Sequence, residues 1–437
     1  MKRRSSFAFG FLALIAIGAA LLSAPFARAA GTWGDLSNAL FTACSAVCVT
    51  GLTVVDVETE YSSAGLAVIV ALVEIGGIGL MTLGTFLLVA IGRRLSLTSE
   101  FSLMNAYGVP AVRGLRGLIF WVVGSMAVIQ MLGTAFLCWR TGDFREAAFY
   151  SAMNFCNAGF SIHPGSLVHF ADDSWALVAM AVLTLLGGIG FLVIYNLCTC
   201  RFRRRASGGR GRLTLHSATV LRFTFYLTAG MLAAFLLVEW DSALNGFPLW
   251  KKLAVGFYQA VTPRTCGFSV VPTESLHPLT RLLYELMMFV GAGPGSVAGG
   301  LKVTTLAVLV YTLTAMCRGE TETVIDRRTV PVEIVRESIV ILVALFAFVA
   351  LVTGALFVTE ERSGMALDAL FFEAVSAVTT TGLSMGDTTA SLSRSGRVVV
   401  MLAMFAGRLG ALTVVMAIGD RESSRRIRYP TEELVVG

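Results

Sequence analysis

The sequence predicts an all-α membrane protein whose chain repeats one unit four times. Its 437 residues are 56% apolar and 14% charged, whereas soluble domains average about 45–50% apolar and about 25% charged residues. Uncharged runs of roughly 20 residues, the length of a helix that crosses a bilayer, recur about eight times. Four short segments between these runs share one pattern built on a glycine. Together these regularities predict about eight transmembrane helices and four shorter re-entrant half-helices.

The uncharged runs divide the chain into four units of two runs each. They begin near Phe7, Ser62, Gly117, Trp175, Phe223, Leu286, Ser338 and Val398. We expect repeat one at residues 1–95, repeat two at 96–202, repeat three at 203–318, repeat four at 319–420 and a C-terminal tail at 421–437. The sixth run is interrupted by glycines, so the second helix of repeat three is expected to be broken.

The first thirty residues fit either a signal peptide or a first transmembrane helix. A basic start, an apolar run and Ala27–Ala29 imitate a signal peptide with an A-x-A cleavage site. The run from Phe7 to Phe26 is nevertheless 20 uncharged residues. This is longer than the apolar region of a signal peptide, which has roughly 7–15 residues, and long enough to span a bilayer. We favour retention, because removal would leave repeat one without its first helix.

Arginines are concentrated in the loops between the repeats, and this fixes the expected orientation. Six lie in residues 201–212, and others cluster in 93–116, 318–336 and 421–428. Positively charged loops stay in the cytoplasm, so these loops, the tail and both termini are predicted to be cytoplasmic. The glycine segments then lie on the opposite side. Binding of nucleic acid is disfavoured, because the basic clusters lie on loops of a multi-pass membrane protein.

The repeated pattern occurs in Phe41–Thr53, Phe149–Ser161, Phe257–Ser269 and Phe372–Ser384. In each copy a phenylalanine lies ten residues before a glycine, which Leu or Phe and then Thr or Ser follow. The motif glycines are Gly51, Gly159, Gly267 and Gly382. Glycine permits unusual dihedrals and close approach, and rings of four such backbones replace the hydration shell of a cation with carbonyl oxygens. An ion pathway between four motifs is therefore the leading expectation.

The segments before the motif glycines are predicted to be re-entrant half-helices. Asp35–Val47 and Leu367–Val378, for example, have helical spacing, but about 12 residues cannot cross a bilayer. Irregular backbone at membrane depth persists only where protein buries it or where it lines a cavity. The motif after each half-helix should therefore be extended and face the shared axis.

The second run of each repeat carries a signature of small residues. It reads Gly76-Gly77-Ile78-Gly79, Gly187-Gly188-Ile189-Gly190, Gly291-Ala292-Gly293 and Gly407-Arg408-Leu409-Gly410. In repeats one and two we favour close helix packing as its purpose. Residues 291–300 contain five glycines and Pro294, which disfavours a continuous helix. We expect two half-helices joined there by a mobile loop beneath the motif glycines.

Four ionisable residues lie at membrane depth, where such residues are expensive and usually functional. Arg408 replaces a glycine of the fourth signature, and the structural alternative is that it pairs with carbonyls of the 291–300 loop. Glu74 and Lys302 raise the same question more weakly. Arg264, in the third motif, is expected to hold the motif through hydrogen bonds to carbonyls or neighbours, with a fixed charge that tunes ion occupancy as the alternative.

No constellation of residues indicates catalysis. The eight cysteines include no Cys-x-x-Cys pair, so small buried apolar residues are expected rather than disulfides or metal ligands. The four histidines are scattered, and neither a Ser-His-Asp arrangement nor a nucleotide-binding loop is found. The chain is predicted not to be an enzyme and to hold no organic cofactor.

The chain resembles the KtrB membrane subunits of bacterial Ktr potassium-uptake systems, in the Trk/Ktr/HKT superfamily, over nearly its whole length. The segments that carry the resemblance are Leu40–Asp56, Gln259–Ser269, Gly291–Thr305 and Ile427–Gly437. It implies four repeats of span, pore half-helix and span (M1-P-M2) in a pseudo-fourfold array around one pore. It also implies a homodimer in the cytoplasmic (inner) membrane of a bacterium, with a cytoplasmic ring of nucleotide-binding KtrA-type subunits.

The resemblance also assigns roles to residues. A K+ selectivity filter formed by backbone carbonyls is implied at Cys48, Val49, Thr50, Gly51, Cys156, Asn157, Ala158, Gly159, Arg264, Thr265, Cys266, Gly267, Thr379, Thr380, Thr381 and Gly382. A gate is implied at Gly291, Gly293, Pro294, Gly295, Ser296, Gly299, Gly300, Lys302 and Arg408. Two departures from the family pattern are Pro294, which could stiffen the loop, and the hydroxyl-rich fourth motif, which could alter ion preference.

These observations predict a channel or transporter that takes up K+ down its electrochemical gradient, with K+ at the filter carbonyls as its only metal. Stimulation by Na+ is left open by the resemblance. One rival is a sodium or non-selective monovalent-cation transporter of the same fold. The other is a membrane scaffold or receptor that conducts nothing, which four filter-like motifs argue against.

Overall fold

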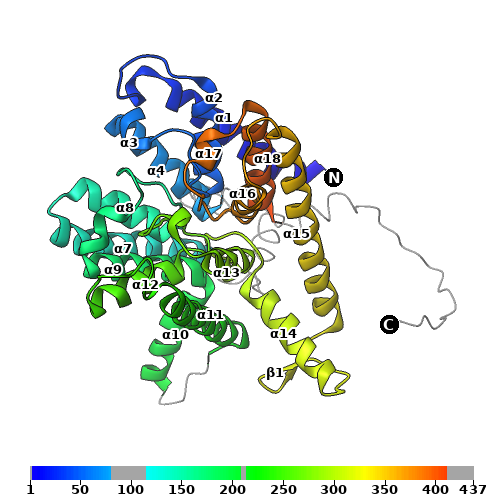
Figure 1. Cartoon of the computed structure of the whole chain (residues 1–437). Helices are drawn as coiled ribbons and strands as arrows, with labels where there is room; N and C mark the ends of the chain where they lie inside the picture. The colour runs from blue at the N-terminus through cyan, green and yellow to red at the C-terminus, as the bar shows by residue number, and fades with distance from the viewer. Residues whose placement is uncertain (1, 80–114, 208–212, 411–437) are drawn as a thin grey trace.

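The computed structural model describes residues 2–79, 115–207 and 213–410, and this part of the chain is mostly helical (Figure 1). The elements are α1 (Lys2–Ser23), η1 (Pro25–Ala27), α2 (Leu36–Cys48), α3 (Val57–Glu60), α4 (Ser63–Ile78), α7 (Leu115–Thr141), α8 (Phe144–Cys156), η2 (Val168–Asp172), α9 (Ser174–Ile189), α10 (Phe191–Ser207), α11 (Leu215–Glu239), α12 (Leu249–Val261), η3 (Thr273–Ser275), α13 (Pro278–Phe289), α14 (Val303–Cys317), β1 (Val324–Ile325), β2 (Arg328–Thr329), α15 (Val332–Thr359), α16 (Leu367–Thr379), α17 (Thr388–Ser391) and α18 (Arg394–Leu409). The two short strands pair antiparallel, with Val324 opposite Thr329.

Three of the described helices are long and apolar enough to cross a membrane by themselves. They are α7 from Phe120 to Thr141, α11 and α15. Large apolar side chains such as Leu132, Leu237 and Leu351 are exposed on them, as expected of helices that face lipid rather than water. Helices α1, α4, α7, α9 and α18 begin within five residues of a predicted run, whereas α11, α13 and α15 begin six to eight residues before theirs. Apart from α7, α11 and α15, these helices are shorter. The predicted boundary at residue 95 and the tail at 421–437 lie outside the described residues.

Three of the shorter helices end at a glycine that has a left-handed backbone. Helices α4, α9 and α18 stop just before Gly79, Gly190 and Gly410, whose φ angles are 84°, 92° and 88°. Side chains rarely tolerate this conformation, whereas glycine adopts it freely. At Gly190 the chain turns by 95° from α9 into α10. The second run of repeat two is therefore bent at the last glycine of its signature.

Four 13-residue helices, α2, α8, α12 and α16, precede the motif glycines. At 1.5 Å per residue each is about 20 Å long, shorter than the roughly 30 Å hydrocarbon core. Asp35 caps α2 by accepting a hydrogen bond from the Ser37 amide (2.9 Å), and Asp143 caps α8 through the Arg145 amide (2.8 Å). The helical prediction for these segments is confirmed.

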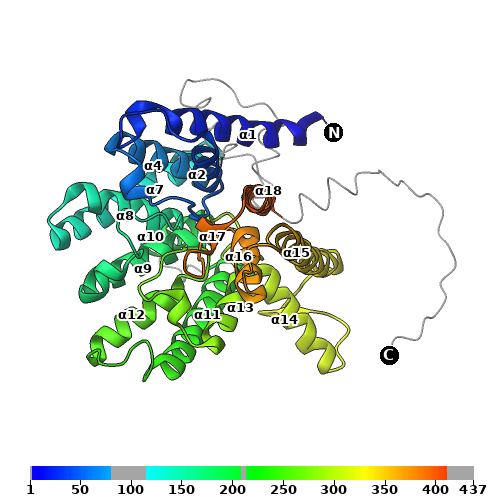
Figure 2. The same cartoon turned by 45° about the horizontal axis from the view of Figure 1, so that its top comes forward.

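The four parts of the chain surround a common centre in sequence order. Figure 2 shows the blue, cyan, green and yellow-to-orange segments following one another around this centre. Helix α18, near the end of the described chain, contacts α2 near its beginning. The arrangement is therefore closed, and the short helices lie toward the inside.

Helix α1 is integrated into this arrangement. It packs against α2 and α4. The segment that imitates a cleavage site is bonded to the chain before α4, because the Ala29 amide donates to the Glu60 carbonyl (3.1 Å) and the Ser62 amide to the Ala27 carbonyl (2.9 Å). Arg28 forms an ion pair with Glu60.

Candidate functional site

The four motif glycines pack against one another in a closed ring. Each lies against the carbonyl of the residue just before the next motif glycine. The pairs are Gly51 with Ala158, Gly159 with Cys266, Gly267 with Thr381 and Gly382 with Thr50. A Cβ atom added to Gly51 would lie 2.7 Å from the Ala158 oxygen, and one on Gly267 would lie 2.5 Å from the Thr381 oxygen. Close approach of backbones therefore requires glycine at these positions.

All four motifs share the same unusual backbone. The motif glycines have φ angles of 96°, 49°, 80° and 88°. The residues two positions earlier are also left-handed: Val49 (56°), Asn157 (56°), Thr265 (72°) and Thr380 (53°). A left-handed residue with a side chain costs about 1–2 kcal/mol, and such strain persists where the surroundings impose it. The motif is thus turned at two points rather than uniformly extended as predicted.

Hydroxyl groups on the short helices hold the backbone of two motifs. The amide of Gly51 donates to Ser45 Oγ (3.0 Å), and the amide of Gly382 donates to Ser376 Oγ (3.1 Å). Sequence reasoning missed both serines, although each lies six residues before its glycine. Between the second and third motifs, Tyr258 Oη donates to Asn154 Oδ1 (2.6 Å) inside the protein.

A second kind of contact fixes the chain just after the glycine. Tyr150 Oη and Ser161 Oγ are 2.9 Å apart, and Ser384 Oγ donates to Glu373 Oε2 over 2.9 Å. Both contacts join the residue nine before a motif glycine to the residue two after it. Glu373 is fully buried, and Thr389 also donates to its carboxylate. Glu373 was not predicted as a site residue from the sequence.

A cavity of about 530 Å³ opens onto the glycine ring, and we call it the vestibule. All four motif glycines line it, together with the acidic residues Asp56, Glu274 and Asp387. The described residues that line it include no Lys or Arg. A cavity lined by one sign of charge concentrates ions of the opposite sign, so the vestibule favours cations.

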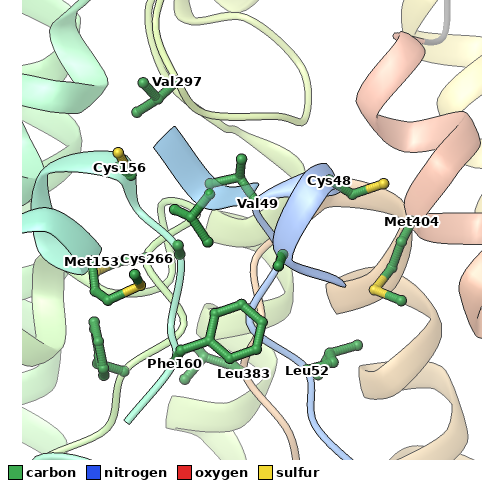
Figure 3. Close-up of a cluster of buried hydrophobic side chains, with 14 of the residues drawn as sticks. Cys48, Val49, Leu52, Met153, Cys156, Phe160, Cys266, Val297, Leu383 and Met404 are labelled. Atoms are coloured by element: carbon green, nitrogen blue, oxygen red, sulfur yellow. The ribbon is translucent and has the colours of Figure 1, made fainter. Parts of the chain in front are cut away.

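The loop at 290–302 lies at the other end of the motifs. It separates α13 from α14, so the predicted break in the second helix of repeat three is confirmed. Val297, in this loop, is 1% exposed, and Cβ atoms added to Gly77 and Gly187 would contact its methyl groups at 3.5 and 3.4 Å. Figure 3 shows Val297 next to Cys156, in the same buried cluster as Val49.

Backbone hydrogen bonds attach the loop to repeat two and to itself. The Gly293 amide donates to the Gly188 carbonyl (2.9 Å), and the Phe191 amide donates to the Gly295 carbonyl (3.2 Å). Lys302 Nζ donates to the carbonyl of Ala298, 2.6 Å away in the same loop. These hydrogen bonds therefore hold the loop in a defined position against the C-terminal end of α9.

Arg408 joins the loop to repeat one. Its guanidinium, in the last turn of α18, donates to the carbonyls of Val297 and Gly76. Arg264 instead donates to hydroxyls on α11, Thr228 Oγ1 at 3.2 Å and Thr224 Oγ1 at 3.4 Å. Arg408 thus pairs with one carbonyl of the loop and one of α4, and Arg264 pairs with hydroxyls of α11.

Small residues of the second runs serve close packing, as predicted for repeats one and two and here also in repeat four. Gly76, Gly187 and Gly407 each lie against the carbonyl four residues before a motif glycine, which belongs to Val47, Phe155 and Val378 respectively. Glu74, two residues before Gly76 on α4, accepts a hydrogen bond from Gln130 of α7 (2.7 Å). The motif cysteines Cys44, Cys48, Cys156 and Cys266 are free and buried, as expected of small apolar side chains.

Comparison with known proteins places the chain in a family. Residues 17–426 match the TrkH family, described as a cation transport protein. The chain is 33% identical to the Ktr system potassium uptake protein B of Bacillus subtilis (98% of this chain, 96% of the relative). It is 31% identical to the potassium/sodium uptake protein NtpJ of Enterococcus hirae (98% and 96%).

The fold agrees with that assignment. The crystal structure of the potassium transporter TrkH from Vibrio parahaemolyticus superposes with a TM-score of 0.72 at 18% identity, covering 94% of this chain and 84% of the other. The prediction that the chain is not an enzyme is confirmed by the family. The chain is a membrane transport protein and belongs to the TrkH family of cation transporters.

Proposed function

We propose that the chain is the membrane subunit of a bacterial potassium-uptake system and conducts K+ through the ring of motif glycines. Its four parts are M1-P-M2 repeats in a pseudo-fourfold array. The observation that carries the proposal is the closed glycine ring at the base of an acidic vestibule. Four backbones with matching left-handed residues supply four sets of carbonyls, which is what a cation filter requires.

The carbonyls of residues 48–51, 156–159, 264–267 and 379–382 replace the hydration shell of K+. The acidic vestibule raises the local concentration of cations before they shed water. The membrane potential contributes about 2.3 kcal/mol per charge per 100 mV to inward movement. The hydrogen bonds from Ser45 and Ser376 and the contacts of Tyr150 and Glu373 hold the strained backbone in place for this exchange.

The 290–302 loop is the gate in this proposal. Val297 closes the pathway with an apolar side chain, because hydrophobic constrictions exclude water and ions. Arg408 holds Val297 through its carbonyl and opposes cations electrostatically. The short loop between two half-helices changes position when a regulator binds one arrangement better than the other.

The regulator is proposed to be a cytoplasmic ring of nucleotide-binding KtrA-type subunits bound to a homodimer of this chain. Support comes from relatives at 31–33% identity, two of which are named as Ktr system potassium uptake protein B. The arginine-rich loops support a cytoplasmic position for both termini and an external position for the vestibule. The bacterial relatives indicate the inner membrane.

Growth of a bacterium that lacks its own potassium-uptake systems tests the proposal. Expression of the chain with its cytoplasmic partner should restore growth on low K+, and the Gly382→Ala variant should not. Gly354→Ala is the matched control, because Gly354 lies on α15 with open space beside it. Restored growth with Gly382→Ala at normal expression would refute conduction through the ring.

A sodium-transporting function is the second candidate, because the Enterococcus hirae relative is named for potassium and sodium together. Competition between the two ions distinguishes them. If K+ is the substrate, excess Na+ leaves uptake of a K+ tracer unchanged, whereas equal inhibition by both ions indicates a non-selective pathway.

A further inference from the structure

Two histidines and a glutamate converge at the edge of the vestibule. Glu146 lies in the first turn of α8, His163 follows the second motif, and His169 lies in η2. Glu146 Oε1 is 2.7 Å from His163 Nε2 and 3.8 Å from His169 Nε2. One ligand atom from each residue lies within 4.8 Å of the other two. Two of the four histidines in the chain are therefore gathered at one point.

The geometry suits a transition-metal dication. Tetrahedral Zn²⁺ has ligands at about 2.0–2.2 Å, which places the ligand atoms roughly 3.3 Å apart. The distances from Glu146 Oε1 to the two histidine nitrogens, 2.7 and 3.8 Å, lie on either side of that value, so small side-chain movements complete the site. Imidazole nitrogens and one carboxylate form a typical zinc set with an open fourth position. Alkaline-earth ions prefer sites made of oxygen alone.

We propose that Glu146, His163 and His169 form a Zn²⁺ site that regulates entry of cations into the vestibule. The site is accessible, because the side chains of His169 and His163 are 57% and 28% exposed. His163 itself lines the vestibule. A bound dication there opposes the negative field that concentrates K+.

The site is also connected mechanically to two motifs. Ser161, two residues after Gly159, donates to the carbonyl of His163 (2.9 Å). Ser166, between the two histidines, accepts from the amide of Ser269 in the third motif (3.0 Å). Zn²⁺ would join η2 and this loop to α8, and so would restrict the chain that follows both motif glycines.

Binding is tested with the purified full chain in detergent, using Zn²⁺ alone as the probe. Cys198 and Cys317, the exposed cysteines among the described side chains, and Cys200 beside Cys198 are first replaced by serine, so that these thiols do not compete. Isothermal titration should show one Zn²⁺ per chain, with at least tenfold weaker binding after His163→Gln and His169→Gln together. His277→Asn, at the start of α13, is the matched histidine control and should bind like the parent.

X-ray absorption at the zinc edge separates this site from any other. The parent should show nitrogen and oxygen ligands with imidazole scattering, which the double variant loses. Sulfur ligands, unchanged binding in the double variant, or no binding by the parent would overturn the proposal. If Glu146 and His163 only form a hydrogen bond that supports the loop, the zinc spectrum of the parent would show no imidazole scattering that the double variant loses.

The effect on entry rests on the proposed function and is measured separately. In liposomes, Zn²⁺ on the vestibule side should reduce K+ uptake severalfold in the parent and leave the double variant unaffected, while the same concentration of Mg²⁺ has no effect. Zinc bound at the site with unchanged uptake would overturn the regulatory role. A chain that binds Zn²⁺ but transports no K+ under any condition would instead contradict the proposed function and leave the metal site standing.

Discussion

Gly382 lies against the carbonyl oxygen of Thr50, so the last motif closes on the first. The two residues belong to the first and the last motif, so their contact closes the series of motifs into a ring. The same packing recurs three more times. Because each glycine supports its neighbour's carbonyl, a change in one motif is expected to affect the whole ring.

Replacing each of the four motif glycines by alanine should be more damaging the more closely the added Cβ atom would approach the neighbouring carbonyl. Gly382→Ala should be the most damaging, because its Cβ would overlap the Thr50 oxygen, and Gly159→Ala the least, because its nearest contacts are 3.2 Å away at a φ of 49°. A left-handed alanine costs about 1–2 kcal/mol even without a clash. Thermal stability and K+ flux per folded protein measure the order. The reverse order would contradict the ring.

Arg408→Gln should raise K+ flux in the absence of the cytoplasmic partner and weaken the nucleotide response. The variant loses the charge and the paired donors that hold the carbonyls of Val297 and Gly76. Arg394→Gln, on the exposed first turn of the same helix, is the control. Flux into liposomes with and without the partner measures both effects. Parent-like behaviour of a folded Arg408→Gln protein would place the gate elsewhere, and shortening 291–300 would then also leave basal flux unchanged.

Val297→Ala should increase basal flux, because it removes the methyl groups that pack toward Gly77 and Gly187. Val303→Ala tests whether loss of a buried valine alone explains the result, since Val303 is fully buried at the start of α14. Single-turnover ion efflux from loaded liposomes compares the two. Equal efflux from both variants would mean that Val297 is a packing residue only.

The mature protein should retain α1. Phe11, Ile15, Ala19 and Leu22 are buried, and the Ala27–Ala29 segment is bonded to the chain before α4. Intact-mass analysis of the purified protein checks this directly. A mature chain that starts at Ala30 or Gly31 would contradict the assignment of this helix to repeat one.

Local signals explain why much of the architecture could be predicted. Each short helix and each motif glycine depends on nearby residues, such as the Asp35 and Asp143 caps and the fixed spacing from phenylalanine to glycine. The break in repeat three followed from the glycines and proline of one segment. These features are set by backbone preferences that a sequence displays directly.

The remaining features depend on partners far away in the chain. The 95° turn at Gly190 follows from its approach to the 290–302 loop, since a Cβ there would lie 2.6 Å from the Pro294 carbonyl. Arg264 turns to the hydroxyls of α11 because they lie within reach, and nothing near it in the sequence indicates them. Glu373 was missed because its partners, Ser384 and Thr389, become meaningful only once the motif is folded.

The most direct test of the account is the relative permeability to K+ and Na+ of the parent, Gly51→Ser and Gly354→Ser in identical liposomes. Gly51 has a φ of 96°, and its Cβ would lie 2.7 Å from the Ala158 oxygen, so a side chain there must move a carbonyl of the ring. If strain of about 1–3 kcal/mol is relieved by weaker coordination of K+ alone, it changes the selectivity by a factor of about 5 to 150. We predict a K+-selective parent, a ratio of K+ to Na+ permeability reduced about tenfold in Gly51→Ser, and a parent-like ratio in Gly354→Ser. An unchanged ratio in a well-folded Gly51→Ser protein would show that the ions do not pass the glycine ring.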